Sequence, residues 1–491
     1  MIQHSTFGKF RNGNSRHWAL AMAIRLSRTQ WGGVYDPQIQ SSGFFHAAQI
    51  AGHWWLIDPD GGRFLSKGIN NVRFEPDSVQ ITNRVPYAEA CRHKYGSKIA
   101  WQAATARRLL SWGFNSLGAW SDEAVGRGGA TPLAVLPNLD LGASYTWQTR
   151  FGGEQIQPFP DVFDEGFDTH VRNRARELCQ SRRDDPGILG WFTDNELRWG
   201  PDWRGTDELL TIFFNLPPAS PGRRAAIALM HERYRQFHAF NAVWCTAARS
   251  WEELSRAQFV VAPYGRNTLR GGDKAAEHPG TDSKHAAFVA DCETFVSRLA
   301  QRYFESTRAA IKAADPNHMV LGCRFAYVPR RAIIESAARF ADVVSFNCYE
   351  FDPSVTMDAY AWTGKPCMIT EFSFRGDDSG LPNTIGAGPR VATQADRARC
   401  YREYVTAGLH RPSFVGYHWF EHADQPAEGR FDGENSNYGA VTIHDDVYED
   451  LTRTMTAVNN EADRIHTGRK LQADARIKVP GAQVISRQSP G

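Results

Sequence analysis

The sequence lacks any apolar run long enough to cross a membrane. Its 491 residues contain no stretch of about 18 consecutive apolar side chains, so we expect no transmembrane helix. It also lacks an excess of charge of either sign, because 56 Lys and Arg stand against 54 Asp and Glu. A net charge of +2 gives no general attraction to nucleic acid or to an anionic membrane, so we expect neither as a partner.

Paired cysteines and the common cofactor motifs are missing as well. The 8 cysteines are widely spaced, with no C-x-x-C pair and no zinc-type spacing, which indicates small buried residues rather than a disulfide framework. The sequence has no H-E-x-x-H, no His-x-His pair, no P-loop and no G-x-S-x-G. We therefore expect no metal site and no cofactor.

Eight short apolar runs are present, each ending in polar or aromatic residues and followed by a helical pattern. They cover residues 64–71, 114–120, 133–139, 188–196, 320–325, 343–349, 367–372 and 415–420. Continuous apolar runs are typical of parallel strands covered on both faces. Eight strand–helix units predict an α/β fold, a (β/α)8 TIM barrel. The competing fold is an open doubly wound sheet, which would need a glycine-rich phosphate turn where this chain has SKGINN.

Three regions are predicted along the chain. They are an N-terminal extension (1–45), a catalytic barrel (46–467) and a loosely ordered polar tail (468–491). Residues 54–64 indicate a β-hairpin that leads into the first barrel strand. The stretch at about 201–280 is too long for a plain loop and predicts a helical insertion after strand four, roofing one side of the barrel mouth. Helices are predicted at residues 99–112, 284–314 and 394–409, the last opened by a capping box of Thr393 and Asp396.

The N-terminus loosely resembles a secretion signal. Lys9, Arg11 and Arg16 precede a seven-residue apolar run, Trp18 to Ile24. The run is at the short limit for such a signal, and no small-x-small cleavage site follows it. A cytoplasmic location is favoured, and a periplasmic or secreted one stays open.

Two predicted strands end in glutamate. Thr193-Asp194-Asn195-Glu196 closes the fourth run and Ile369-Thr370-Glu371-Phe372 closes the seventh. A glutamate at the carboxyl end of a barrel strand points into the mouth, where a carboxylate is costly to bury unless it is used or paired. Hydrolysis of a glycosidic bond needs two carboxyl groups of this kind, and a separation of about 5–5.5 Å would give retention of configuration.

The neighbours of the two glutamates predict different roles. Asn195 is placed to hold a sugar hydroxyl, so we assign Glu196 as the general acid/base. Glu371 is the nucleophile, with Tyr349 from the sixth run as a hydrogen-bond donor. Ionised Glu371 would raise the pKa of Glu196 and keep it protonated. The structural alternative is that each glutamate pairs with a nearby arginine, Arg198 or Arg375.

The eighth run and the loop after it carry further candidate sugar contacts. Trp419 offers a flat apolar face for a pyranose, and the acidic, amide-rich loop 421–438 matches sugar hydroxyls. The alternatives are a core role for Trp419 and a calcium site in the loop, which lacks the spacing of an EF-hand. The other candidate contacts end predicted strands or lie in this loop: Asn70, Asn71, Trp120, Arg324, Asn347, His418, Glu434 and Asn435. Each of those at a strand end could equally satisfy backbone groups.

The chain resembles clan A retaining glycoside hydrolases, most closely the β-agarases of glycoside hydrolase family 50. The similar stretches are WWLIDPDGGRFLSKGIN, LGWFTDNELRWG, ITEFSFRGDDSGLPNT and GYHWFEHADQPAEGRFDGENSNYG, within about residues 50 to 465. The resemblance implies exo-acting hydrolysis of β-1,4-galactosidic bonds in agarose or agaro-oligosaccharides by double displacement, without a cofactor. Glu196 matches the acid/base position and Glu371 the nucleophile position.

One departure from the family bears on the substrate. Those agarases often carry an N-terminal carbohydrate-binding domain, and about 45 residues cannot hold one, which favours short oligosaccharides or a related β-galactoside over the polymer. The segment FNAVWCTAARSWEEL resembles β-galactosidases of family 42, so a β-galactosidase or another clan A β-glycosidase is the alternative. A second alternative is a non-catalytic carbohydrate-binding barrel. The expected partner is an oligo- or polysaccharide, and a homo-oligomer stays open.

Overall fold

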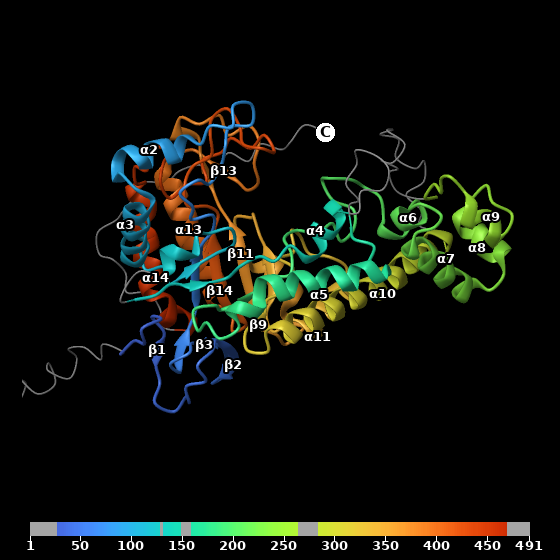
Figure 1. Ribbon diagram of the computed structural model, residues 1–491, viewed down its shortest axis with the longest axis horizontal. Helices are drawn as coiled ribbons and strands as arrows, with labels where there is room; N and C mark the ends of the chain where they lie inside the picture. The colour runs from blue at the N-terminus through green and yellow to red at the C-terminus, as the bar shows by residue number, and fades with distance from the viewer. Residues whose placement is uncertain (1–26, 128–130, 149–158, 264–282, 469–491) are drawn as a thin grey trace, which may run out of the picture.

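Eight short parallel strands form the centre of the α/β fold (Figure 1). The computed structural model describes residues 27–127, 131–148, 159–263 and 283–468. The signal-like run at 18–24 and the predicted tail from residue 469 onward lie outside the described residues. In chain order the strands are β5 (Ser66–Ile69), β6 (Ser116–Leu117), β7 (Ala134–Val135), β8 (Gly190–Trp191), β9 (Met319–Val320), β10 (Val344–Asn347), β11 (Cys367–Phe372) and β14 (Phe414–Trp419).

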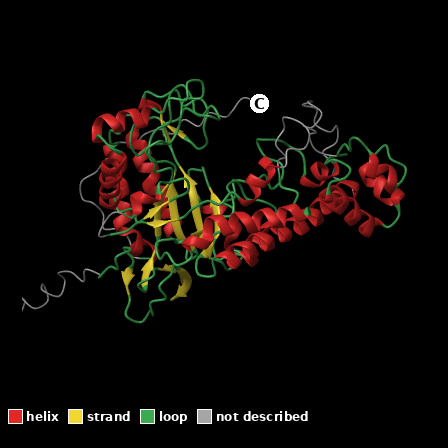
Figure 2. Ribbon diagram, in the orientation of Figure 1, coloured by secondary structure: helices red, strands yellow, loops and turns green. Residues whose placement is uncertain are grey.

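All pairings among these strands are parallel. Six of them form one sheet in the order β10-β11-β14-β5-β6-β7, and β8 pairs with β9. Isolated parallel bridges join the two groups on both sides, from Val135 to Ile188 and from Phe325 to Phe346. The strand residues are buried throughout, as expected for parallel strands that are covered on both faces, and helices surround them (Figure 2).

The predicted hairpin at 54–64 is confirmed as part of a larger antiparallel sheet. Its strands lie in the order β1 (Val34–Tyr35), β4 (Gly62–Phe64), β3 (His53–Ile57) and β2 (His46–Ile50). Leu56 and Phe64 of this sheet share a buried cluster with Val343, Met368 and Val415, at or next to the amino ends of the parallel strands. The small sheet therefore closes the end of the fold opposite the strand termini that carry the glutamates. Strand β1 precedes residue 46, so this sheet includes part of the predicted extension 1–45.

The helices that pack around the parallel strands are α2 (Pro86–Tyr95), α3 (Lys98–Ser111), α4 (Leu141–Gln148), α5 (Glu165–Cys179), α10 (Ser283–Ala314), α11 (Arg331–Phe340), α12 (Ser354–Ala361), α13 (Gln394–Leu409) and α14 (Glu449–His466). Of these, α3, α10 and α13 confirm the helices predicted at residues 99–112, 284–314 and 394–409. The capping box that opens α13 is confirmed, because the Thr393 hydroxyl accepts the amide of Asp396. A short parallel pair, β12 (Arg375–Gly376) and β13 (Arg390–Val391), lies in the loop between β11 and α13. No helix in the described part of the chain is long and apolar enough to cross a membrane.

The strand–helix alternation is interrupted once, contrary to the sequence prediction. Between β6 and β7 the described residues form only a 3-10 turn, Glu123–Gly126, in place of an α-helix. This connection contains three glycines in the sequence GRGG, and glycine is a poor helix former.

The helical insertion after β8 is confirmed, but its helices do not form the predicted roof over the strand ends. Its helices are α6 (Leu209–Phe214), α7 (Pro221–Tyr234), α8 (Phe237–Trp244) and α9 (Trp251–Arg256). They pack on the amino-terminal part of the 32-residue helix α10, which carries them away from the strands (Figure 1). Phe213 and Trp244 are buried against Phe295 and Phe288 of α10. Helices α6 to α9, called the helical arm below, therefore have apolar contacts of their own.

Candidate active site

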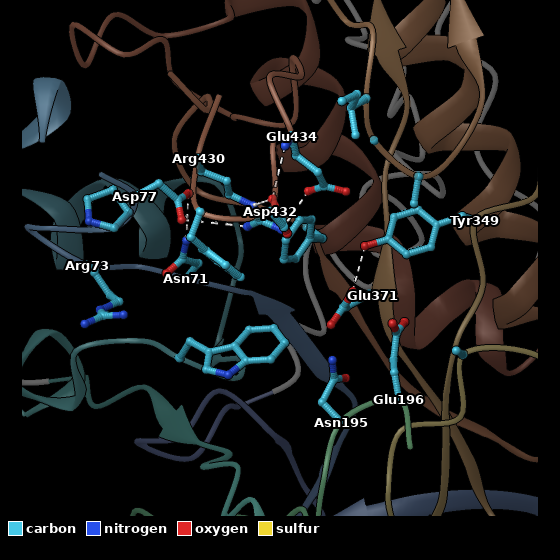
Figure 3. Close-up of a pocket in the computed structure, with 18 of the residues that line it drawn as sticks. Asn71, Arg73, Asp77, Asn195, Glu196, Tyr349, Glu371, Arg430, Asp432 and Glu434 are labelled. Atoms are coloured by element: carbon cyan, nitrogen blue, oxygen red, sulfur yellow. Dashed lines mark hydrogen bonds and ion pairs between the residues drawn. The ribbon is translucent and has the colours of Figure 1, made fainter. Parts of the chain in front are cut away.

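A cavity of about 970 Å³ opens where the parallel strands end (Figure 3). Its lining residues all lie at or beyond the carboxyl ends of the strands. They come from the segments that follow β5 (Asn71, Arg73, Asp77), β6 (Trp120), β8 (Asn195, Glu196, Trp203), β9 (Ala326), β10 (Tyr349) and β14 (Phe420, Arg430, Glu434), and from β11 itself (Glu371). This is the edge at which barrel enzymes and open α/β enzymes place their active sites.

Glu196 and Glu371 line the same cavity, as the sequence predicts (Figure 3). Their electrostatic interaction is strong enough to be one of the main causes that raise the pKa of Glu196. Asn347 connects them, because its Nδ2 lies 2.7 Å from Glu196 Oε1 while its backbone is in register with Glu371 on the neighbouring strand.

Glu371 is held by a cation and by a hydrogen-bond donor. Arg324 Nη2 lies 2.8 Å from Glu371 Oε1, and the Tyr349 hydroxyl donates to Oε2 at 2.7 Å. The predicted contact between Tyr349 and Glu371 is therefore confirmed. Both Arg324 and Glu371 are buried, so their attraction is little screened by water.

The environment of Glu196 favours a protonated carboxyl group. Desolvation and the charge of Glu371 raise the pKa of Glu196 to about 7. The amide of Asn347 and the charges of Arg204 and Arg324 act in the opposite direction and limit this increase. Two carboxyl groups with such different surroundings can serve as a proton donor and an anion at neutral pH.

The arginines of the structural alternative do not pair with either glutamate in the described part of the chain. Arg198 donates to the carbonyls of Gly200 and Asp207, and Arg375 donates to that of Gly388 and to Ser436 Oγ. The partner of Glu371 is Arg324 from β9, a residue far away in sequence.

Several residues in the cavity wall or directly behind it have strained backbones. Asn71, Trp120, Glu196 and Arg324 have φ between 47° and 60°, in the left-handed region that favours glycine. Each follows a strand, so this conformation turns the chain sharply and directs the side chain at the strand end. Strain of this kind is concentrated at functional sites, where packing holds a fixed geometry.

Besides the two glutamates, five of the predicted site residues line the cavity. They are Asn71, Trp120, Asn195, Tyr349 and Glu434. Two predicted substrate contacts on β14, Trp419 and His418, are wrong. Trp419 is fully buried with its Nε1 bonded to the carbonyl of Tyr438, and His418 is fully buried against Ser66 Oγ at 2.9 Å. Neither side chain reaches the cavity, because both point into the packed layers around β14.

Four further predicted substrate contacts do not line the cavity either. Asn70 is buried and donates to the carbonyls of Thr370 and Trp419. Asn435 accepts the amides of Thr384 and Ile385, which commits it to a loop contact. Arg324 and Asn347 are buried next to the glutamates and do not line the cavity, so they hold Glu371 and Glu196 rather than face the cavity.

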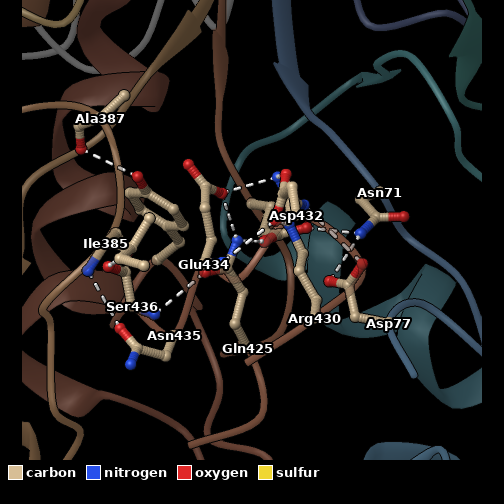
Figure 4. Close-up of polar contacts among 12 residues, drawn as sticks. Asn71, Asp77, Ile385, Ala387, Gln425, Arg430, Asp432, Glu434, Asn435 and Ser436 are labelled. Atoms are coloured by element: carbon tan, nitrogen blue, oxygen red, sulfur yellow. Dashed lines mark hydrogen bonds and ion pairs between the residues drawn. The ribbon is translucent and has the colours of Figure 1, made fainter. Parts of the chain in front are cut away.

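Sequence reasoning did not find Arg430, the central cation of the loop after β14 (Figure 4). Its guanidinium lies 2.6 Å from Glu434, 3.0 Å from Asp432 and 3.7 Å from Asp77, so it neutralises carboxylates from two walls of the cavity. The positive charge bound by this acidic loop is thus supplied by the side chain of Arg430. Among the residues in the described ranges, no group of three or more His, Cys, Asp and Glu could hold a metal ion.

Two curated proteins are similar to this chain over most of its length. It is 27% identical over 501 residues to β-agarase B of Vibrio sp. (strain JT0107), covering 88% of this chain and 50% of the relative. It is 29% identical over 506 residues to β-agarase A of the same organism, covering 89% and 48%. The chain therefore spans about half the length of the curated relatives it matches. No protein-family model matches it.

Solved structures share the fold. A structure of an exo-β-agarase superposes with a TM-score of 0.73 at 24% identity, covering 92% of this chain and 70% of that one. A crystal structure of another agarase gives a TM-score of 0.72 at 25% identity, covering 92% and 69%. The fold around the cavity is thus the one found in these agarases.

Proposed function

We propose that this chain is a retaining β-glycosidase of agarase type that hydrolyses β-1,4-galactosidic bonds in agarose or agaro-oligosaccharides. The observation that carries the proposal is the pair of carboxyl groups, Glu196 and Glu371, that line one cavity in opposite electrostatic environments. The similarity to two β-agarases over nearly nine-tenths of this chain supports the choice of substrate. Glycoside hydrolysis uses such a pair without a cofactor.

In the first step, the Glu371 carboxylate attacks the anomeric carbon and the bond to the leaving oxygen breaks. Glu196 gives its proton to that oxygen, and a glycosyl ester forms on Glu371. Arg324 and Tyr349 bind the oxygens of Glu371 directly and hold its carboxylate in place for the attack.

In the second step, water replaces the enzyme at the anomeric carbon. Glu196, now a carboxylate, takes a proton from the water, whose oxygen attacks the anomeric carbon as the bond from that carbon to the Glu371 carboxylate breaks. The loss of the negative charge on Glu371 in the ester removes one cause of the raised pKa of Glu196, which suits Glu196 for its role as a base. Two inversions leave the product with the configuration of the substrate.

We further propose that the eight parallel strands close into a (β/α)8 barrel within residues 46–467. Each strand has its neighbour in chain order from β5 to β11, β14 follows β11, and β14 pairs with β5. The bridges from Val135 to Ile188 and from Phe325 to Phe346 support closure at the two remaining seams. In this arrangement Glu196 and Glu371 lie on the fourth and seventh strands.

Product analysis on agarose and on neoagaro-oligosaccharides tests the function. We expect neoagaro-oligosaccharide products whose new reducing end first appears as the β-anomer in NMR spectra. Hydrolysis of simple aryl β-galactosides in preference to neoagaro-oligosaccharides would instead favour the alternative of a β-galactosidase. No release of product from either class would refute glycosidase activity.

Rescue by azide separates the roles of the two glutamates. Glu196→Ala should retain turnover of a dinitrophenyl glycoside, which needs no acid, and azide should raise this rate and give the β-glycosyl azide. Glu371→Ala should give the α-glycosyl azide, because azide then attacks in place of the nucleophile. Exchange of these two products between the variants would reverse the assignment.

A further inference from the structure

Trp203 is an exposed aromatic side chain on the rim of the cavity. It lines the cavity after β8, yet 69% of its surface is exposed to solvent. A tryptophan so exposed leaves a large apolar face in contact with water, and such faces next to a binding cavity mark contact sites for ligands.

The backbone under Trp203 is held in a tight turn. Asp202 and Gly205 exchange backbone hydrogen bonds at 2.8 and 3.1 Å, which places Trp203 and Arg204 at the tip. The Asp202 carboxylate caps the turn by accepting the amide of Arg204 at 2.8 Å. A Cβ at Gly205 would lie 2.8 Å from the Arg198 guanidinium, so the turn is packed closely from below.

Arg204 fixes the tryptophan ring and links it to the acid/base residue. Its guanidinium lies 4.6 Å from the centroid of the Trp203 ring, and Nη1 donates to the backbone carbonyl of Glu196 at 2.6 Å. Nη2 binds Asp202 Oδ2, also at 2.6 Å. One face of the indole is therefore supported by a cation that is itself held at two points, so little conformational freedom is lost when a ligand binds to the rim.

We propose that Trp203 is a stacking platform for a sugar unit on the leaving-group side of the cleaved bond, and that Arg204 is a positioning residue that couples this platform to Glu196. The proposal rests on the proposed function. The side follows from chemistry: the general acid must reach the leaving oxygen, and Trp203 belongs to the same loop as Glu196. An indole face is suited to the C–H face of a pyranose.

The charge of Arg204 supports the coupling. The pKa of Glu196 is raised by desolvation and by Glu371, and it is lowered by Asn347, Arg204 and Arg324. Asn347 and Arg324 lie at or beyond the ends of neighbouring strands, whereas Arg204 belongs to the same loop as Glu196. A sugar on Trp203 would press on the Arg204 side chain, which contacts the backbone of Glu196 directly.

The first test measures how activity depends on the leaving-side sugar. The substrates are neoagarohexaose and a β-glycosyl fluoride of the transferred sugar, which has no sugar on the leaving side. For Trp203→Ala we expect the loss of kcat/KM on neoagarohexaose to exceed the loss on the fluoride by about tenfold. Trp362→Ala is the matched control, because Trp362 also stacks on an arginine, Arg331 at 3.7 Å, but lies outside the cavity lining.

Equal losses of kcat/KM on both substrates would refute the proposal that Trp203 is a stacking platform. If the wild-type protein hydrolyses neither substrate, the proposed function itself fails, and the two outcomes are thus distinguishable. Binding can also be measured without turnover, by calorimetric titration of neoagarohexaose into the Glu371→Gln variant. Adding Trp203→Ala to this variant should weaken the binding of neoagarohexaose about tenfold.

The second test addresses Arg204. Arg204→Gln removes the charge next to Glu196, so the basic limb of the kcat/KM profile should move to higher pH, while Arg204→Lys should keep the limb near its original position. A purely structural role would lower activity in both variants without moving the limb, and that result would overturn the coupling.

Discussion

Arg324 Nη2 lies 2.8 Å from Glu371 Oε1, and both side chains are buried. The same guanidinium donates to Asn195 Oδ1 at 2.9 Å and to the carbonyl of Thr370 at 3.0 Å. One cation from the end of β9 thus holds residues from the strand ends of β8 and β11. It fixes the neighbour of the proposed acid and the proposed nucleophile at the same time.

Replacement of Arg324 by glutamine should therefore lower kcat by about 100-fold or more. The change leaves the carboxylate of Glu371 buried without its counter-charge. Removing one partner of a buried ion pair costs roughly 3–5 kcal/mol, because the remaining charge is left uncompensated. Steady-state kinetics on neoagaro-oligosaccharides would measure the effect, with circular dichroism to check the fold.

Arg223→Gln is the matched control for this variant. Arg223 is also a buried arginine, but it lies on α7 in the helical arm and donates only to carbonyls there. It should lower the thermal stability and leave kcat of the folded protein near the wild-type value. Equal kinetic effects of the two changes would mean that Arg324 acts through stability alone.

The raised pKa of Glu196 predicts where activity ends on the basic side. A general acid must be protonated, so kcat/KM should fall as the pH rises through about 7. In Glu371→Gln one cause of the raised pKa is removed, so the pKa of Glu196 should fall. A ¹³C NMR titration of the glutamate carboxyl groups in this variant checks the direction, and a pKa that stays near 7 would contradict the coupling between the two groups.

The sequence predicts the presence and order of the eight parallel strands, because burial on both faces makes the runs continuous. It predicts their ends less well, since β6 to β9 end three to five residues before the predicted runs. It also locates both glutamates and the start of α13, since a capping box is a local signal. The same continuity hides which face each residue takes. A shift of one residue separates Trp419, which is buried, from Phe420, which lines the cavity, and likewise Asn70 from Asn71.

Features that depend on contacts between distant parts of the chain have no local signal in the sequence. The direction of the helical arm depends on packing of α6 and α8 along α10, and the partner of Glu371 comes from a strand about 50 residues away. For Trp203 a local signal was present, because Asp-Trp-Arg-Gly has the composition of a tight turn that exposes its two central side chains.

Two tryptophans at strand ends should respond differently to truncation. Trp120 lines the cavity beneath the guanidinium of Arg324, 4.6 Å from its ring centroid, so Trp120→Ala should raise KM by about tenfold or more. Trp419 packs against Phe372 and Tyr401 in the core, so Trp419→Ala should lower the free energy of unfolding by about 3–5 kcal/mol. Urea denaturation and kinetics on the same preparations separate the two. A Trp419 variant of normal stability with a raised KM would restore the stacking role that the structure contradicts.

Asp445 should contribute stability that depends on pH. Its carboxylate is buried and accepts the hydroxyls of Tyr87 and Tyr95 and two bonds from Arg108. Burial alone would raise the pKa of Asp445, but the hydrogen bonds and charge of Arg108 outweigh it and hold the pKa well below its usual range. A lowered folded-state pKa gives stability that is fully present above the unfolded value of about 4 and is lost as the pH falls through the folded value.

Asp445→Asn keeps the shape and tolerates the left-handed φ of 63° at this position, so it removes mainly the charge. At pH 7 we expect a loss of about 3 kcal/mol in the free energy of unfolding, and this difference from the wild type should shrink steadily below pH 4. Asp446→Asn, at the exposed neighbouring position, should change little at either pH. Urea denaturation at a series of pH values checks this, and a difference that stays constant down to pH 3 would show that the charge of Asp445 is not what holds α2 and α3 to this loop.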